Sequence, residues 1–120
     1  MTQFTPKPVK PTVPFATFDA LDIRLGTIEE VAKVPDSRKL VALTVSFGDH
    51  NRTILAGLQG ERADLVALVG VQTLFVINLE PRRMAGAISE GMLFDIGYAD
   101  GLQPAMTLAE HPLPAGTRAG

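Results

Sequence analysis

The stretch VALTVSFGDHNRTILA, residues 41–56, decides the fold of this chain. Its first half, residues 41–47, alternates valine, leucine and phenylalanine with alanine, threonine and serine, which is the period of a β-strand with one buried face. Residues 48–51 have turn chemistry, and residues 52–56 return as a second apolar strand. The stretch therefore predicts a β-hairpin on which the rest of the chain packs.

Further strands are predicted on both sides of this hairpin. Ile23–Val34 reads as a long strand whose alternation slips at Gly26, and a glycine at such a slip indicates a bulge or a sharp bend. Val71–Leu79 is almost continuously apolar, which is typical of a strand buried on both faces. Glu61–Leu68 predicts a short helix, and Gly91–Tyr98 predicts a fifth strand.

Three strands, a helix and two strands follow one another in the order of the OB fold. We therefore predict an all-β fold with a short helix, a five-stranded OB-type β-barrel over residues 15–114 with short N- and C-terminal extensions. Residues 1–14 hold four prolines and few apolar groups, so they predict a flexible arm. A single helical turn with a side-chain N-cap is expected at residues 17–21, and residues 115–120 are expected to form a tail.

The composition limits what kind of protein this is. A chain of 120 residues with 46% apolar residues has room for one domain, and without cysteine it has no disulfide or thiolate zinc site. Its most apolar stretch, Leu65–Leu79, is interrupted by polar residues and is shorter than the roughly 20 residues that cross a bilayer, so we expect a soluble, cytoplasmic protein. The net charge of −2 argues against general coating of nucleic acid, although basic residues outnumber acids between Lys33 and Arg83.

Signatures of catalysis are missing from the sequence. His50 and His111 have no second ligand at metal-binding spacing, so no metal site is expected. Glu29 and Glu30 point to opposite faces of one predicted strand, which is wrong for an acid–base pair. Residues 57–60, GLQG, lack the following lysine and hydroxyl residue of a phosphate-binding loop. We expect a binding protein without a cofactor, not an enzyme.

Residues 78–92, NLEPRRMAGAISEGM, are the most unusual stretch. Arg82 and Arg83 follow a strand-ending proline, and arginines on such a loop can fork to phosphate oxygens. Ser89 can bond a phosphate or a base edge, and Met92 offers a soft apolar surface. The alternative interpretation is a solvated loop whose methionines fill gaps in the core.

Four segments occur in order along the chain: DIRLGTI (22–28), PDSRKL (35–40), RTILAGL (52–58) and NLEPRRMAGAISEGM (78–92). Together they resemble the tRNA-binding domain family, and the match runs from about Phe15 to Pro114. That family includes the C-terminal dimerising domain of bacterial methionyl-tRNA synthetase, free-standing tRNA-binding proteins and the secretion chaperone CsaA. The resemblance supports an OB fold independently of the strand order.

The resemblance implies a non-catalytic protein that recognises tRNA shape and phosphate backbone through the loop before strand five. The implied tRNA-binding positions are Arg82, Arg83, Ser89, Met92, Lys39 and Arg38. Ala85 stands where the tRNA binders usually carry arginine, and this favours the alternative of a CsaA-like chaperone that binds unfolded or precursor polypeptides. An apolar surface for polypeptides would use Met84, Ile88 and Met92.

The aromatic residues favour recognition of shape over bases. Phe47, Phe75 and Phe94 occupy predicted core positions and Tyr98 lies near a strand end, so no exposed stacking platform is expected. Apolar residues outside the predicted barrel core, together with the dimeric free-standing relatives, predict a homodimer. These residues are Phe15, Phe18, Leu21, Leu102, Met106 and Leu108.

Overall fold

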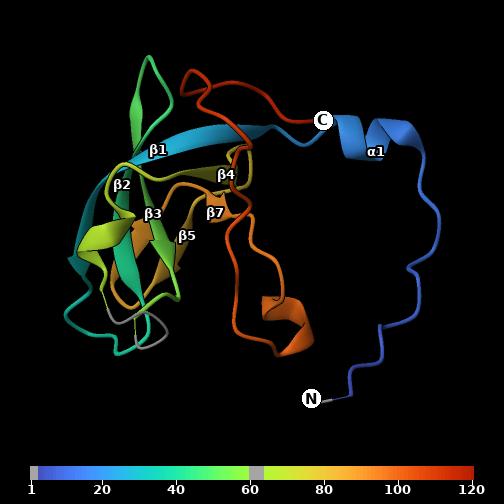
Figure 1. The fold of residues 1–120 in the computed structure, drawn as a ribbon, viewed down its shortest axis with the longest axis horizontal. Helices are drawn as coiled ribbons and strands as arrows, with labels where there is room; N and C mark the ends of the chain where they lie inside the picture. The colour runs from blue at the N-terminus through green and yellow to red at the C-terminus, as the bar shows by residue number, and fades with distance from the viewer. Residues whose placement is uncertain (1–2, 60–63) are drawn as a thin grey trace.

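The computed structural model of the protein describes residues 3–59 and 64–120. Within these residues, one short α-helix, seven strands and two 3-10 helices follow one another (Figure 1). They are α1 (Phe15–Asp19), β1 (Ile23–Lys33), β2 (Val41–Ser46), β3 (Asn51–Ala56), η1 (Val66–Leu68), β4 (Gln72–Val76), β5 (Arg82–Met84), β6 (Ala87–Ser89), β7 (Met92–Leu93) and η2 (Tyr98–Asp100). In the part of the chain that is described, no helix is long and apolar enough to cross a membrane.

Five strands form one antiparallel sheet in the order β3-β2-β1-β4-β7, and β5 and β6 form a separate hairpin. The first half of β1 pairs with β4 and its second half pairs with β2. After β6 the chain returns to the outer edge of β3, where the Glu90 amide donates to the Thr53 carbonyl at 2.8 Å. The sheet is thereby nearly closed into a barrel, and the predicted all-β, OB-type fold is confirmed.

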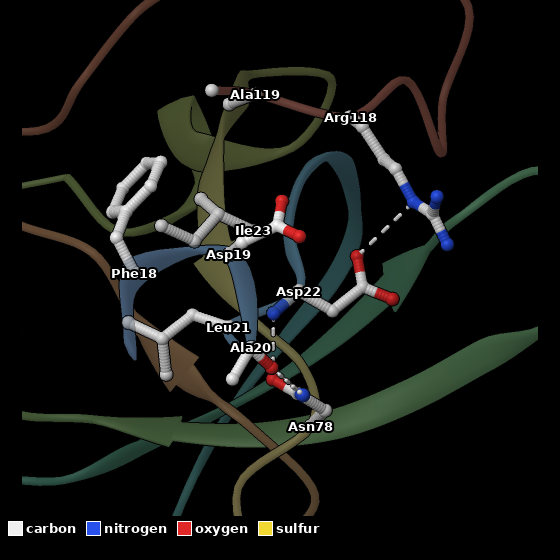
Figure 2. Close-up of a pocket in the computed structure, with 10 residues that line it drawn as sticks. Phe18, Asp19, Ala20, Leu21, Asp22, Ile23, Asn78, Arg118 and Ala119 are labelled. Carbon is white, nitrogen blue, oxygen red and sulfur yellow. Dashed lines mark hydrogen bonds and ion pairs between the residues drawn. The ribbon is translucent and has the colours of Figure 1, made fainter. Parts of the chain in front are cut away.

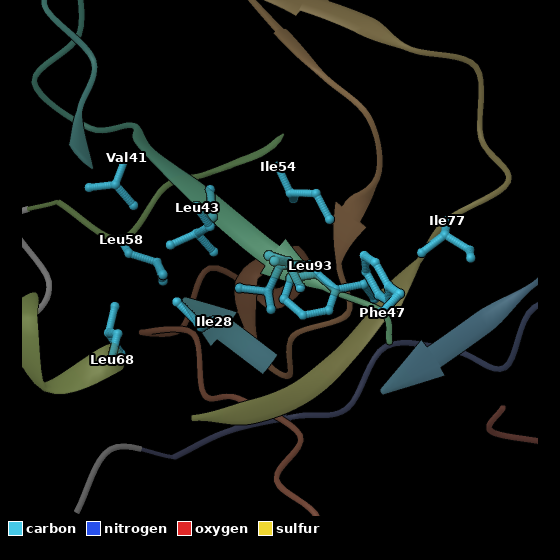
Figure 3. Packing of buried hydrophobic residues seen from close by; sticks show 12 residues of the cluster. Ile28, Val41, Leu43, Phe47, Ile54, Leu58, Leu68, Ile77 and Leu93 are labelled. Atoms are coloured by element: carbon cyan, nitrogen blue, oxygen red, sulfur yellow. The ribbon is translucent and has the colours of Figure 1, made fainter. Parts of the chain in front are cut away.

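The core lies inside this barrel (Figure 3). The predicted alternation along β2 is confirmed, because Val41, Leu43 and Val45 are completely buried while the residues between them are half-buried. The rings of Phe47 and Phe75 meet edge to face with their centroids 5.8 Å apart. Aromatic pairs in this geometry add to the stability that area burial supplies, so these two rings anchor the centre of the core.

Gly26 does not form the bulge that the sequence predicted. It pairs in register with Thr73 on β4, and the register shift in β1 falls between Ile28 and Glu30. A Cβ atom at Gly26 would collide with Val45 and lie 2.8 Å from the ring of Phe47. The glycine is therefore explained by the close approach of β2 side chains, and the bulge occurs where β1 passes from one partner strand to the other.

Three other elements differ from the sequence predictions. The helix expected at Glu61–Leu68 lies partly outside the described residues, and its described end holds only the 3-10 helix η1. The fifth strand is shorter than predicted, because only Met92 and Leu93 pair with β4 as strand residues before the chain turns back and pairs Ile96 with Ala105. The N-cap of α1 is Pro14, which makes no side-chain capping hydrogen bond.

The C-terminus lies beside α1, next to the start of β1, whereas the arm before α1 runs away from it (Figure 1). Residues 116–119 run along β1, with the Gly116 amide donating to the Leu25 carbonyl at 2.7 Å and the Ala119 amide donating to the Ile23 carbonyl at 2.8 Å. Helix α1 buries none of its residues, and the described arm before it is exposed throughout. Within the arm, Lys7 donates to the Ala99 carbonyl at 2.6 Å and pairs with Asp100 at 3.4 Å.

Candidate functional site

The turn between β1 and β2 presents a lysine at the protein surface. The Ser37 hydroxyl accepts hydrogen bonds from the amides of Lys39 and Leu40, at 3.2 and 2.9 Å. The Ser37 amide in turn donates to the Val34 carbonyl at 3.1 Å. A serine that bonds the backbone two and three residues ahead stabilises a tight turn, so the PDSRKL segment sets the position of Lys39.

Lys39 is held along its whole length. Its carbonyl accepts from the Gln59 amide at 2.9 Å, and a Cβ atom at Gly57 would lie 3.1 Å from its Cε, so the aliphatic stem rests on the Gly57 backbone. Its Nζ donates to the hydroxyl oxygen of Tyr98 at 3.1 Å and lies 4.8 Å from the centre of that ring. The Lys39 ammonium group thus connects the turn after β1 to η2.

The arginine pair lies on a hairpin, where the sequence predicted a loop. Strand β5 pairs Arg82 with Ser89, and the hairpin tip is Ala85-Gly86 with φ values of 48° and 81°. Two successive residues with positive φ form the mirror-image turn that suits the twist of a two-residue hairpin. Ala85 occupies a left-handed conformation that costs a non-glycine residue about 1 kcal/mol.

The alternation of β5 sends the two arginines to opposite faces. Arg82 and Met84 share one face, whereas Arg83 lies on the other face with its cross-strand partner Ile88. Arg82 and Met84 line a pocket, and Ile88 is 49% exposed on the side away from it. The adjacent residues Arg82 and Arg83 therefore lie on two different surfaces, the pocket and the outer face of the hairpin.

Ser89 closes the barrel from inside. It is only 3% exposed, and its hydroxyl accepts from the Leu55 amide and donates to the Gly91 carbonyl, both at 2.9 Å. A Cβ atom at Gly91 would lie 3.1 Å from both the Ile54 side chain and the Val76 carbonyl oxygen. Residues 89–92, the SEGM segment, thus pack where β3, β4 and β7 meet. The Ser89 hydroxyl both donates to and accepts from backbone groups there.

The candidate site is a pocket of about 460 Å³ between the turn after β1, the end of β3, the β5–β6 hairpin, β7 and η2. Its lining combines apolar side chains with cations and one aromatic ring. Six of the lining residues are Lys39, Leu40, Arg82, Met84, Met92 and Tyr98. Asp95 also lines it, and its carboxylate accepts the Tyr98 amide at 3.0 Å.

The structure brings together only part of the predicted site. Lys39, Arg82, Met84 and Met92 line the pocket. The others lie elsewhere: Arg83 and Ile88 on the outer face of the hairpin, Arg38 exposed in the turn after β1, and Ser89 buried in the barrel seam.

Sequence reasoning missed Tyr98, Leu40 and Asp95 in this pocket. The prediction that Phe94 lies in the core is wrong, since it is 41% exposed, whereas Phe47 and Phe75 are buried as expected. The reason is the early end of β7, which leaves Phe94 and Tyr98 on a surface segment. The lone tyrosine was visible in the sequence, but nothing there placed it beside Lys39.

A second, polar pocket lies where α1 meets β1 (Figure 2). Asn78 accepts the Asp22 amide and donates to the Ala20 carbonyl, both at 2.7 Å. The Asp22 carboxylate pairs with Arg24 at 2.9 Å and with Arg118 at 3.6 Å. The hydrogen bond from Arg24, aided by the charge of that residue and of Arg118, lowers the pKa of Asp22 although its partial burial opposes the shift. These motif residues therefore join the start of β1 to the end of β4 and to the C-terminal segment.

Within the described residues, no group of three or more histidine, cysteine, aspartate or glutamate side chains is placed to hold a metal ion. Residues 23–118 match the family model described as putative tRNA binding domain. The chain belongs to this family. The resemblance carried by the four sequence segments is thereby confirmed.

Individual relatives come from synthetases and from chaperones. The chain is 38% identical over 108 residues to the methionine–tRNA ligase of Phocaeicola vulgatus, a match that covers 89% of this chain and 16% of the ligase. The MetRS-related protein from Pyrococcus horikoshii superposes with a TM-score of 0.82 at 27% identity, covering 92% of this chain and 100% of that one. The chaperone CsaA from Bacillus anthracis superposes with a TM-score of 0.79 at 26% identity, with the same two coverages.

Proposed function

We propose that this chain binds tRNA without catalysing a reaction, and that the pocket and the β5–β6 hairpin form the binding surface. The observation that carries the proposal is the meeting of Lys39 and Arg82 at one pocket, from segments far apart in the sequence of a tRNA-binding-domain protein. Two cations and the exposed side of Met92 share this site in a chain whose net charge is −2. The positive charge that phosphate needs is thus concentrated where the family motif lies.

Each cation has a different part in this proposal. Arg82 offers a planar fork of donors that can grip a phosphate from the edge of the pocket, and Lys39 adds a point charge whose position Tyr98 sets. Arg83 and Arg38, both exposed, would contact phosphates that pass outside the pocket. Ser89 acts by holding β3 against the SEGM segment, so its influence on binding is indirect.

Polypeptide binding is the second candidate, and the apolar part of the pocket favours it. Leu40, Leu58, Met84 and Met92 line the same space as the two cations, and methionine-rich surfaces adapt to varied partners. The structural similarity to the chaperone CsaA points the same way. Ile88 lies on the other face of the hairpin, so a polypeptide in the pocket would not meet it.

We further propose that the protein forms a homodimer through α1. Phe15 and Phe18 form a ring pair 5.9 Å apart, and both remain exposed together with Leu21. An isolated chain gains nothing from presenting three large apolar side chains beside its C-terminus, whereas a two-fold contact with a second copy buries them. A strictly monomeric mass by light scattering at micromolar concentration would exclude this assembly.

A mobility-shift assay with bulk tRNA tests the proposed function. Wild type is expected to bind with a shallow dependence on salt, because few phosphates are neutralised. The double variant R82A/R83A should lose most of this binding and keep its fold, since exposed charges contribute little to stability. As a matched control, I88A changes the outer face of the same hairpin, adds no charge beside Arg83 and does not touch the pocket, so it should bind tRNA nearly as wild type does.

Absence of tRNA binding by wild type would overturn the proposal. The chaperone function would be supported if wild type binds a denatured polypeptide that tRNA does not displace. In that case M84D should bind the polypeptide more weakly, whereas I88D should bind it as wild type does.

A further inference from the structure

The Tyr98 ring lies in the candidate site and is held by hydrogen bonds at its backbone and at its hydroxyl. Its residue is 56% exposed, yet its amide donates to the Asp95 carboxylate at 3.0 Å and its hydroxyl accepts from Lys39 at 3.1 Å. Gly97, with φ of 109°, turns the chain into η2 immediately before it. An exposed ring whose backbone and tip are both held has little conformational freedom left to lose when a ligand covers it.

The surroundings of the ring suit a flat, apolar ligand that carries negative charge. Met92 is 47% exposed in the same pocket, and Leu40 and Met84 add apolar surface. Arg82 lines the pocket as well, and the Lys39 ammonium lies 4.8 Å from the centre of the tyrosine ring. The volume of about 460 Å³ falls within the roughly 300–1,000 Å³ that is usual for small-ligand sites.

We propose that this pocket receives one unpaired base of the bound RNA, stacked on Tyr98, with the phosphates of the same strand at Lys39 and Arg82. This inference rests on the proposed tRNA binding and names the part of the tRNA that the site takes. A nucleotide always joins a flat π-face to a phosphate, which matches an exposed ring beside two cations. A polypeptide side chain brings no obligatory anion, so it matches less well a pocket in which two cations outnumber the single carboxylate of Asp95.

Only an unpaired base fits this requirement. In a duplex both faces of a base are covered by its neighbours, whereas in single-stranded loops and ends a base can turn out and stack on a protein ring. Stacking accepts every base, since each has a π-face, so the site discriminates paired from unpaired RNA and not one sequence from another. The sequence predicted recognition of shape and phosphates without base stacking, because three phenylalanines were expected in the core and Tyr98 near a strand end.

The composition of the chain offers a direct test. Tyr98 is the single tyrosine and there is no tryptophan, so tyrosine fluorescence of the whole chain reports on this pocket alone. We would titrate the full chain with a short single-stranded oligoribonucleotide and with a blunt-ended RNA duplex of the same length. A free tyrosine derivative corrects for light absorbed by the RNA. The single strand is expected to quench the emission, and the duplex is expected to leave it unchanged.

Variants test the same inference without fluorescence. Y98L should weaken binding of bulk tRNA by roughly 5- to 150-fold, the range for loss of one stacked base, whereas Y98F keeps the ring and should retain most of the affinity. F94L removes an exposed aromatic ring that does not line the pocket, and it should bind as wild type does. Circular dichroism checks that each variant is folded.

The outcomes separate this inference from the proposed function. Binding of tRNA by wild type, with equal affinity in Y98L and no quenching by the single strand, would refute the base pocket and leave tRNA binding intact. Equal quenching by strand and duplex would also refute it. No tRNA binding by wild type would refute both proposals together.

Discussion

Replacing Ser89 by alanine separates a structural role from a contact role. The variant removes the acceptor of the Leu55 amide and the donor to the Gly91 carbonyl, at a residue that is almost completely buried. A buried donor left without its partner costs about 1–3 kcal/mol, and loss of the second hydrogen bond adds roughly 1 kcal/mol. We therefore expect S89A to lose about 2–4 kcal/mol of unfolding free energy, which lowers the thermal midpoint by roughly 8–16 °C.

The assay is thermal unfolding followed by circular dichroism, paired with tRNA affinity measured well below the midpoint of the variant. S46A is the matched control, because the Ser46 hydroxyl accepts a single exposed amide, that of Gly48 at 3.2 Å, and its loss should shift the midpoint very little. Affinity of the folded S89A protein should stay close to that of wild type. An unchanged midpoint together with a fall in affinity of about tenfold or more would show that Ser89 touches the RNA, and our assignment would be wrong.

Four further predictions concern the hairpin, the ion pair and the arm. R82A should weaken tRNA binding more than R83A in a mobility-shift assay, because only Arg82 lines the pocket; the reverse order would refute the division of faces. A85N should raise the unfolding free energy by about 0.5–1 kcal/mol in urea titrations, since Asn-Gly relieves the positive φ of 48° at the hairpin tip. The pKa of Asp22 is lowered by Arg24, so the stabilisation by its carboxylate is full above the ordinary aspartate pKa and is lost as pH falls through the lowered value. D22N should therefore be less stable than wild type at pH 7, and this gap in midpoint should close in acid; a gap that persists there would contradict the ion-pair explanation. Deletion of residues 1–13 should leave the midpoint of wild type nearly unchanged, because the described arm is exposed, and a loss of several degrees would show that it packs.

The family motifs in the sequence mix structural residues with residues that we propose bind RNA, and their chemistry alone did not separate the two. Asp22 and Asn78 are polar and belong to motifs, yet they join the start of β1 to the end of β4. Ser89 has the hydroxyl that a phosphate contact would use, but this hydroxyl already hydrogen-bonds backbone groups of β3 and of residues 89–92. A hydroxyl or carboxylate satisfies a buried backbone group as readily as a ligand, so only its neighbours in space decide which of the two it serves.

The sequence by itself determined the elements whose signals are local. The period-2 pattern of residues 41–47 specified β2, the turn residues after it specified the β2–β3 hairpin, and the four motifs specified the family and its barrel. These signals act between residues close along the chain, where backbone geometry and side-chain alternation leave few options.

The tertiary structure alone decided which side chains share a surface. Arg82 and Arg83 are adjacent, but the pairing of β5 with β6 turns them to opposite faces. Lys39 and Tyr98 are 59 residues apart, and they meet because closure of the barrel brings the turn after β1 to the segment after β7. Such contacts depend on how strands pair over long separations, and that pairing is set by burial of the whole core and by no single stretch of the sequence.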